Sequence, residues 1–319
     1  MIDLRRLHVL RMLDEHRTVT AAAAALHLTP SAVSQQIRML GRDVGVELLE
    51  RVGRGVRLTP AARVLLGHAD RLYADWERVL AEASAAPAGG VLRLCAFPTA
   101  LAALLAPAAA ELRDAAVAVE LTEAGNAECF ALLLAGAVDI AVVLPAPDAP
   151  PRDDPRFDQQ PLLHDPFDLV VPADHRLASA DAVDLAAAAG EPWIGADRGD
   201  DSAIVMAACS AAGFAPRIAH STEGWNAAVA LVSHGFGVCL MPRLAPIPAH
   251  HRVVRIPLRG APAPSRLVLS CVRRGSRAQP AIARGLEALA AVSRHSPLPL
   301  VDGEHEHVGA GPHRHTYRR

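Results

Sequence analysis

Apolar residues recur at helical spacing in the first part of the chain. Between residues 4 and 13 they occupy positions 4, 7, 9, 10, 12 and 13, which predicts a helix followed by a polar turn at residues 14–17. A second helix is predicted to run through Leu26, because Thr18 or Thr20 can cap its first turn and alanines fill residues 21–25. A short turn at residues 27–29 then leads into a third helix.

Thr29 and Pro30 predict where that third helix begins. A threonine hydroxyl can accept from free backbone N–H groups, and proline at the first helical position gives up no hydrogen bond. Helical spacing places three apolar side chains on an inward face: Val33, Ile37 and Leu40. The outward face is polar and carries Ser31, Ser34, Gln35 and Arg38.

The pattern then changes to a hairpin and one long helix. Glycines at positions 53 and 55 separate two short runs that contain arginine, which predicts a wing over residues 48–58. Apolar residues recur at helical spacing from residue 59 to residue 83, and a linker is expected at residues 87–90. The main large side chains of this stripe are Leu65, Leu72, Trp76, Val79 and Leu80.

Beyond residue 90, short β-branched runs alternate with helical stretches. Strands are predicted at residues 91–96, 117–122, 139–144, 168–171, 238–241, 252–256 and 266–272. The alternation predicts α/β layers with a largely parallel sheet, closed by a last helix near residues 279–293. Residues 296–319 are rich in Pro, Gly and His without periodicity, and we expect this tail to be disordered.

Composition and charge narrow the class of protein. A chain of 319 residues with 51% hydrophobic residues favours a globular protein of about two domains. It shows no secretory signal and no apolar run near ~18 residues, so we expect a cytoplasmic protein without a membrane partner. Residues 1–66 hold ten arginines against six acidic residues, whereas the whole chain carries −2, and this asymmetry indicates a basic part that faces DNA.

Signs of catalysis or of a metal site are weak. The five cysteines, Cys95, Cys129, Cys209, Cys239 and Cys271, lie singly and are interpreted as buried thiols, with a redox-sensing thiol as the alternative. Tail histidines at positions 305, 307, 313 and 315 lack a frame that could hold a metal. The GxSxG, GxxxxGK[ST] and HExxH motifs do not occur, so we expect neither an enzyme nor a cofactor.

The order of residues in the first 65 positions is more specific than the helix pattern. The strings TVTAAA at 18–23, LHLTPSAVSQQI at 26–37, GVELLER at 45–51 and RLTPA at 57–61 resemble the N-terminal module of LysR-type transcriptional regulators. Gly41, Leu49, Pro60 and Ala62 depart from the residues common in that family, but none of these changes removes a side chain that would face DNA. The resemblance implies an all-α winged helix-turn-helix domain, a dimerising linker helix and a two-lobed α/β effector domain like the periplasmic binding proteins.

On this resemblance we expect four segments. Residues 1–60 form the winged helix-turn-helix and residues 61–86 the linker and dimerisation helix. Residues 91–295 form the effector domain, with one lobe at about 91–161 and 266–295 and the other at about 162–265, and residues 296–319 form the His-rich tail. The candidate DNA-binding residues are Thr29, Ser31, Ala32, Ser34, Gln35 and Arg38 on the third helix, with Arg51, Arg54 and Arg57 from the wing. An ordinary solvated face is the alternative for both groups.

The effector domain is expected to bind a small molecule at the C-terminal ends of its strands. Candidate wall residues are Thr99, Gly125, Asn126, Leu144, Ala196, Ser202, Thr222 and Phe236. Thr99 could cap the helix that follows it and also contact an anionic effector, and a role as a plain cap is its alternative. Asp200, Asp201 and Glu223 favour a cationic effector if they line this cleft, and a solvated surface is their alternative role.

The expected partners are double-stranded promoter DNA, the effector, a second copy of the chain in a dimer or tetramer and, by the resemblance, RNA polymerase. The linker stripe could instead pack on its own effector domain. A transport receptor would share the C-terminal fold but would lack the DNA module, and an architectural DNA-binding protein without ligand control stays an alternative.

Overall fold

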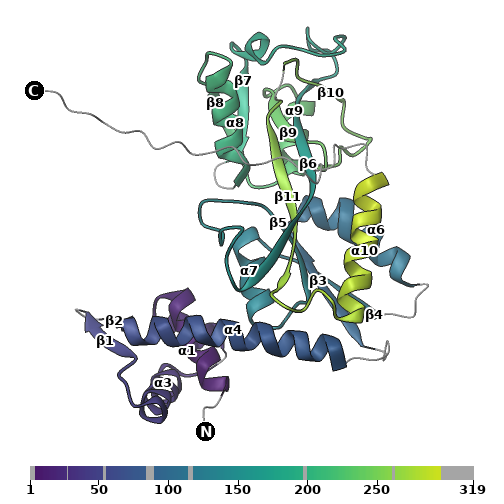
Figure 1. Ribbon diagram of the computed structural model, residues 1–319. Helices are drawn as coiled ribbons and strands as arrows, with labels where there is room; N and C mark the ends of the chain where they lie inside the picture. Colours follow the sequence, from purple (N-terminus) through teal and green to yellow (C-terminus); the bar gives the residue numbers. More distant parts are fainter. Residues whose placement is uncertain are drawn as a thin grey trace, which may run out of the picture. The chain divides into compact units, whose positions relative to one another are not determined.

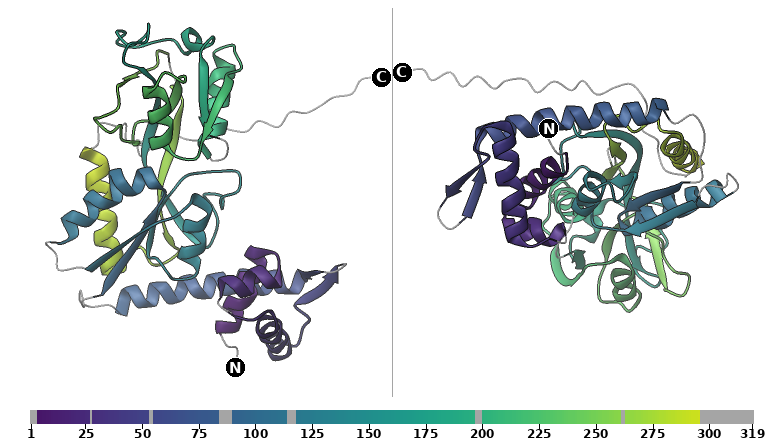
Figure 2. Two further views of the ribbon diagram at one scale, coloured as in Figure 1. Left: turned by 180° about the vertical axis from the view of Figure 1, so that it is seen from behind. Right: turned by 90° about the horizontal axis from the view of Figure 1, so that it is seen from below.

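The structure is a computed structural model that describes residues 4–26, 28–52, 55–83, 90–113, 118–196, 200–260 and 263–295. Contacts divide the chain into two compact units (Figures 1 and 2). The first unit comprises Met1–Ala88 with the two later segments Arg152–Asp158 and Val272–Ala283. The second comprises Gly89–Pro151, Gln159–Cys271 and Arg284–Arg319. The linker at residues 87–89, Arg54 and the tail from residue 296 lie outside the described residues.

Three helices open the first unit: α1 (Leu4–His16), α2 (Val19–Ala25) and α3 (Pro30–Val44). The predicted caps are confirmed, since Thr18 accepts from the N–H of Ala21 at 3.1 Å and Thr29 from that of Ala32 at 3.2 Å. The predicted polar turn at residues 14–17 is wrong, because the polar side chains there continue α1 through His16. The chain turns only at Arg17, which has a φ of 60°.

The inward face of α3 packs as predicted, with Val33, Ile37 and Leu40 buried. Strands β1 (Leu49–Val52) and β2 (Gly55–Leu58) pair antiparallel and form the wing. Helix α4 (Pro60–Ala83) places Ala62, Leu66 and Ala69 in the same hydrophobic core, so the first part of the long helix belongs structurally to the three-helix module.

The second unit contains a seven-stranded sheet in the order β10-β6-β11-β5-β3-β4, with β9 paired to β6. Its strands are β3 (Val91–Ala96), β4 (Ala118–Glu123), β5 (Ile140–Val143), β6 (Phe157–Pro172), β9 (Cys239–Pro242), β10 (Val253–Ile256) and β11 (Ser265–Arg273). The long neighbours β6 and β11 connect a layer with β3, β4 and β5 to a layer with β9 and β10 (Figure 1). We call these layers lobe 1 and lobe 2.

The prediction of a largely parallel sheet is wrong. The pairs β3–β4 and β3–β5 are parallel, but β11–β5, β10–β6 and β6–β9 are antiparallel. Strands β9 and β10 both pair antiparallel with β6, and β5 pairs antiparallel with β11. The predicted strand at residues 168–171 is only the end of β6.

A second, two-stranded parallel sheet in lobe 2 was not predicted. It consists of β7 (Pro192–Ala196) and β8 (Arg217–Thr222). Pro192 and Gly195 are residues that sequence patterns associate with turns, and β8 is too polar to predict a strand. Trp193 nevertheless anchors β7, because its side chain is completely buried in the lobe 2 core.

Short helices cover the sheets. They are α5 (Pro98–Ala100), η1 (Leu101–Leu105), α6 (Ala106–Leu112), α7 (Asn126–Leu134), η3 (Leu185–Ala188), α8 (Asp200–Ala211), α9 (Trp225–Ser233) and α10 (Pro280–His295). The π-helical turn η1 ends two residues before Pro107, whose missing N–H prevents a regular α-helical bond. The last helix was predicted within two residues at each end.

Candidate functional site

The outward face of α3 presents polar side chains over a buried apolar face. Gln35 and Arg38 are exposed and have long side chains that can reach a ligand. The shorter residues are also occupied locally, because Ser34 donates to the carbonyl of Pro30 at 2.9 Å and Ser31 lies 3.0 Å from the hydroxyl of Thr29. Ala32 is half-buried. Gln35 and Arg38 therefore offer the largest free hydrogen-bonding capacity on this face.

The wing adds positive charge beside α3. Arg51 is exposed, and Arg57 donates from Nε to Glu50 at 2.8 Å while remaining 61% exposed. A groove of about 710 Å³ separates α3 from the wing, and its cationic lining residues are Arg38, Arg42 and Arg51. Glu47 and Glu50 also line the groove, so three guanidinium groups outnumber two carboxylates and leave a net positive charge that attracts phosphate.

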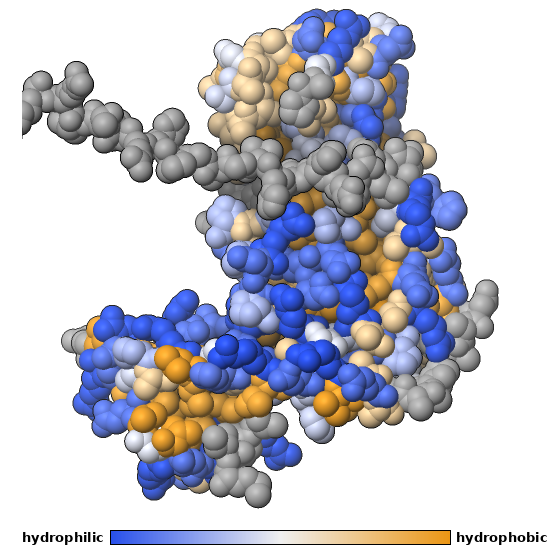
Figure 3. Space-filling model, in the orientation of Figure 1, coloured by the Kyte–Doolittle hydropathy of each residue, from blue (hydrophilic) through white to orange (hydrophobic). Residues whose placement is uncertain are grey.

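Helix α4 carries an exposed apolar stripe after it leaves the core. Leu72 and Trp76 are each 58% exposed, and Val79 and Leu80 follow on the same face. Leu65 is different, because it is half-buried against the core of the first unit. Figure 3 shows apolar surface on the unit that contains α4. Large apolar side chains at this spacing are typical of a helix that packs against a partner.

A cavity of about 200 Å³ lies between the lobes of the second unit, at the ends of β3, β5, β7 and β8. Four of the predicted wall residues line it: Thr99, Asn126, Leu144 and Thr222. Asp201 and Glu223 line it as well. The sequence did not predict the contributions of Phe97, Ile194, Trp225 and Arg266.

The other predicted wall residues take different positions. Gly125 is the N-cap of α7, and Ser202 lines a smaller adjoining cavity of about 50 Å³. Phe236 is 49% exposed and packs edge-on against His220, with 5.3 Å between the ring centroids. The side chains of Ala196 and Asp200 are outside the described residues. Phe236 and Gly125 are thus not among the residues that line the cavity.

Arg266 is the organising residue of this pocket. Its guanidinium is 4% exposed and lies 5.0 Å from the centroid of the Phe97 ring. Nε donates to Asp165 at 3.0 Å, Nη1 to Asp201 at 2.9 and 3.1 Å, and Nη2 to Thr99 at 2.8 Å. The prediction that Thr99 caps the next helix is wrong, because the N-cap of α5 is Phe97 and the Thr99 hydroxyl accepts from Arg266.

Burial dominates the electrostatics of the two carboxylates. Asp165 is completely buried and the Asp201 side chain is 15% exposed, and burial raises the pKa of each although Arg266 acts to lower it. Asp165 also accepts from the N–H of Leu244 at 3.0 Å, which fixes it behind Arg266.

Asn126 holds the loop after β5. Its side-chain amide donates to the carbonyl of Leu144 at 2.9 Å and accepts from the N–H of the same residue at 2.7 Å. These two hydrogen bonds fix the wall of the pocket at Leu144. They also occupy the side-chain amide of Asn126, which the sequence analysis had expected to contact the effector.

The fold agrees with what comparison with known proteins shows. Residues 4–63 match the model of the bacterial regulatory helix-turn-helix protein, lysR family, and residues 85–294 match the LysR substrate binding domain. The chain belongs to the LysR family. As a LysR-type transcriptional regulator, it combines a DNA-binding winged helix-turn-helix with an effector-binding domain.

Similar proteins carry regulatory names. The transcriptional regulator ShiR of Corynebacterium glutamicum is 30% identical over 81% of this chain and 88% of that protein. A probable hydrogen peroxide-inducible genes activator of Streptomyces viridosporus is 31% identical over 92% of this chain and 93% of that protein. Each of these two alignments covers more than four-fifths of this LysR-type regulator.

Solved structures share the fold at lower identity. A single-residue variant of full-length OxyR from Pseudomonas aeruginosa has a TM-score of 0.64 at 21% identity, covering 95% of this chain and 99% of that one. Full-length BenM has a TM-score of 0.58 at 22% identity, covering 94% and 99%. Among its described residues, this regulator has no helix with the length and hydropathy needed to cross a membrane.

Proposed function

We propose that this regulator binds promoter DNA as a homodimer through α3 and the wing, and that a small molecule in the pocket between the lobes controls that binding. The observation that carries the proposal is the polarity of α3, where Gln35 and Arg38 are exposed above buried Val33 and Ile37. A helix with this division can enter a major groove while its apolar face stays in the protein core. The proposed boundaries are residues 1–60 for the DNA-binding domain, 61–86 for the linker and 91–295 for the effector domain.

Base reading is assigned to α3. The amide of Gln35 can pair with adenine, Arg38 can pair with guanine or phosphate, and the methyl group of Ala32 can contact a thymine methyl. Ser31 and Ser34 complete the surface, and Thr29 acts mainly as the cap that fixes the start of the helix. The wing arginines Arg51, Arg54 and Arg57 contact phosphate or the minor groove.

Dimerisation is assigned to the exposed stripe of α4. Burying Leu72, Trp76, Val79 and Leu80 against a second copy would remove a large apolar surface from water, which favours association. A symmetric dimer places its two reading helices about one helical turn of DNA, ~34 Å, or a multiple of it apart. Assembly into tetramers and contact with RNA polymerase are included on the family resemblance alone.

Control by a ligand is supported by the pocket itself. It combines apolar walls with a small set of fixed polar groups, which is the usual construction of a small-molecule site. An architectural DNA-binding protein would not need a buried ion network at the centre of two lobes. The regulator acts in the cytoplasm by binding and not by catalysis.

The experiment is a titration of the full chain against the DNA upstream of its own gene and against a random duplex of equal length, repeated over a range of salt. We expect a protected footprint and a preference for the upstream DNA of at least about a thousandfold. Binding that is weak, indifferent to sequence and lost steeply with salt would show that charge alone attracts DNA, and it would overturn the proposal.

A further inference from the structure

We propose that the effector of this regulator is a small organic cation, such as a protonated amine, bound between the carboxylates of Asp201 and Glu223 beside the rings of Phe97 and Trp225. This inference rests on the proposed function of the pocket and adds the chemical class of its ligand. All the residues involved belong to the second unit.

The donors of Arg266 are largely occupied inside the protein. A guanidinium carries five N–H groups, one on Nε and two on each Nη. Nε binds Asp165, Nη1 binds Asp201, and Nη2 binds Thr99 and also lies 2.9 Å from Asp165. An anionic effector that took the place of Asp165 or Asp201 would remove a partner from a buried charge, which is costly.

The charge around the pocket is negative. Among the described residues that line it, Arg266 is the one cationic side chain, and Asp165 and Asp201 both pair with it. Two carboxylates around one guanidinium leave one negative charge, and Glu223 adds a second at the wall. An anion entering this site would meet like charge in a partly desolvated space, where repulsion is strong.

Glu223 is free to meet a ligand. It is exposed, it lines the pocket, and it makes no hydrogen bond or ion pair within the described part of the chain. It also directly precedes Gly224, the N-cap of α9, and a negative charge is favoured near a helix N-terminus.

A bound cation would also compensate for the burial of Asp201. Burial raises the pKa of this carboxyl, which means that its charged form is poorly solvated in the pocket. An ammonium group beside it would favour the charged form, while the Arg266 pair stays intact. The remaining walls, Phe97, Leu144, Ile194 and Trp225, suit the apolar body of such a ligand, and aromatic faces attract cations.

The test uses compounds that share a skeleton and differ in charge: benzylamine, benzyl alcohol and benzoate, then hexylamine, hexanol and hexanoate. Each is added at millimolar concentration to the full chain, and thermal unfolding and titration calorimetry are measured at neutral pH. We expect the amines to raise Tm above the value with the matching alcohol, and the carboxylates to have no such effect.

Two variants locate the binding. Glu223→Gln keeps the shape and removes the charge, and we expect it to weaken amine binding roughly threefold to tenfold. Glu111→Gln, an exposed position on α6 away from the pocket lining, is the matched control and should leave amine binding unchanged. A preference for carboxylates, no binding of any amine, or equal effects of the two variants would overturn the inference.

DNA binding of the same samples separates this inference from the proposed function. If the chain selects its upstream DNA but no amine binds, the cationic effector is wrong and the regulator assignment stands. If sequence preference for DNA is absent while amines still bind, the proposed function is wrong and the pocket assignment stands.

Discussion

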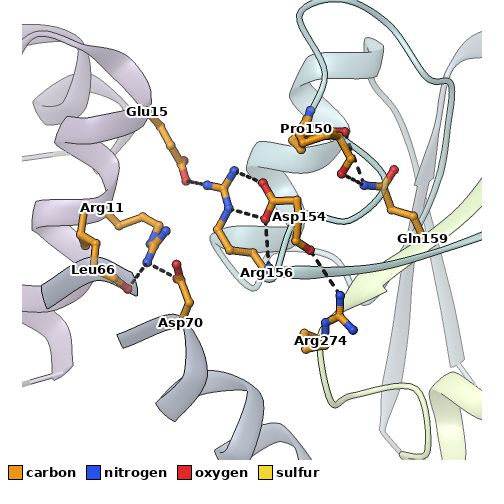
Figure 4. Close-up of polar contacts among 10 residues, drawn as sticks. Arg11, Glu15, Leu66, Asp70, Pro150, Asp154, Arg156, Gln159 and Arg274 are labelled. Atoms are coloured by element: carbon orange, nitrogen blue, oxygen red, sulfur yellow. Dashed lines mark hydrogen bonds and ion pairs between the residues drawn. The ribbon is translucent and has the colours of Figure 1, made fainter. Parts of the chain in front are cut away.

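The guanidinium of Arg156 lies 3.2 Å from the carboxylate of Glu15, although 141 positions separate the two residues in the chain. Both side chains are about four-fifths buried, and Asp154 holds the same guanidinium at 2.9 Å from Nε and 2.8 Å from Nη2 (Figure 4). Nearby, Arg11 pairs with Asp70 and donates to the carbonyl of Leu66 at 3.2 Å. The Glu15–Arg156 pair binds the segment Arg152–Asp158 to α1, and the contacts of Arg11 bind α1 to α4, all within the first unit.

The ion pair between Glu15 and Arg156 predicts how the free energy of unfolding depends on pH. Burial raises the pKa of Glu15 more than Arg156 lowers it. A carboxyl whose folded pKa is raised stabilises the fold fully below its unfolded pKa, and this contribution is lost as pH rises through the folded value. Glutamine resembles the neutral form and does not titrate. Glu15→Gln should therefore gain stability relative to the natural chain as pH rises from about 4 to neutral.

Chemical denaturation at a series of pH values measures this difference. Glu82→Gln, at an exposed position near the end of α4, serves as the control for removal of one negative charge. If the natural chain instead gains stability relative to Glu15→Gln as pH rises, Arg156 lowers the pKa of Glu15 more than burial raises it, and our interpretation is wrong.

A second prediction concerns sequence reading. Gln35→Ala should weaken binding to the specific site by about 1–3 kcal/mol, or roughly 5-fold to 150-fold in Kd, because the variant loses a pair of hydrogen bonds to a base edge. Binding to random DNA should hardly change. The fold should survive, since Gln35 is exposed and α3 is held by its opposite face.

Arg51→Ala in the wing is the matched comparison. A phosphate contact carries no sequence information, so this variant should weaken specific and random binding about equally and reduce the salt slope by about one. Fluorescence anisotropy over a range of salt separates the two effects. Equal losses from Gln35→Ala on both DNAs would disprove the reading role of α3.

The third prediction concerns assembly. Trp76→Glu should convert a dimer to monomers in analytical ultracentrifugation, because it places a charge in the centre of the apolar stripe. Its specific DNA affinity should fall at least about tenfold, since each monomer then binds one half-site alone. Arg78→Ala, which helical spacing places on the opposite face of α4, should remain dimeric. An unchanged oligomer for Trp76→Glu would move the dimer interface elsewhere.

The first unit could be predicted closely because its signals are local. A threonine cap acts within three residues, as Thr18 and Thr29 do, and one face of one helix decides the burial of Val33, Ile37 and Leu40. The same logic failed at Asp14 and Glu15, where a polar run continued α1. There the partner of Glu15 comes from a distant segment that the local pattern does not include.

The sequence predicted where the pocket lies in the second unit, but it did not predict all the residues that line it. Strand ends indicated Thr99, Asn126, Leu144 and Thr222, because ligands collect at that edge of an α/β sheet. Arg266 was missed because it begins an otherwise apolar strand, and its partners Asp165 and Asp201 lie 101 and 65 positions away. An arginine next to a run of apolar strand residues is a signal that could have found it, since a buried charge requires a partner.

The last prediction concerns hydrogen peroxide, which induces the genes controlled by the Streptomyces viridosporus relative according to its name. The five cysteines of this chain are all buried, and none of them forms a disulfide. Burial raises the pKa of Cys209 to about 11 and of Cys239 to about 12, and a hydrogen bond with Cys129 together with burial raises that of Cys95. Peroxide attacks the thiolate, which is almost absent at such pKa values near neutral pH.

We therefore expect that peroxide leaves specific DNA binding unchanged, and that iodoacetamide labels the folded chain slowly at all five thiols. Labelling in denaturant is the control, because unfolding removes the burial and should make every thiol react quickly. A change in DNA binding on peroxide treatment that disappears in one cysteine-to-serine variant would contradict this prediction. That result would mean that the folded chain opens often enough to expose that thiol, so that local unfolding, and not the pKa of the closed state, would govern its oxidation.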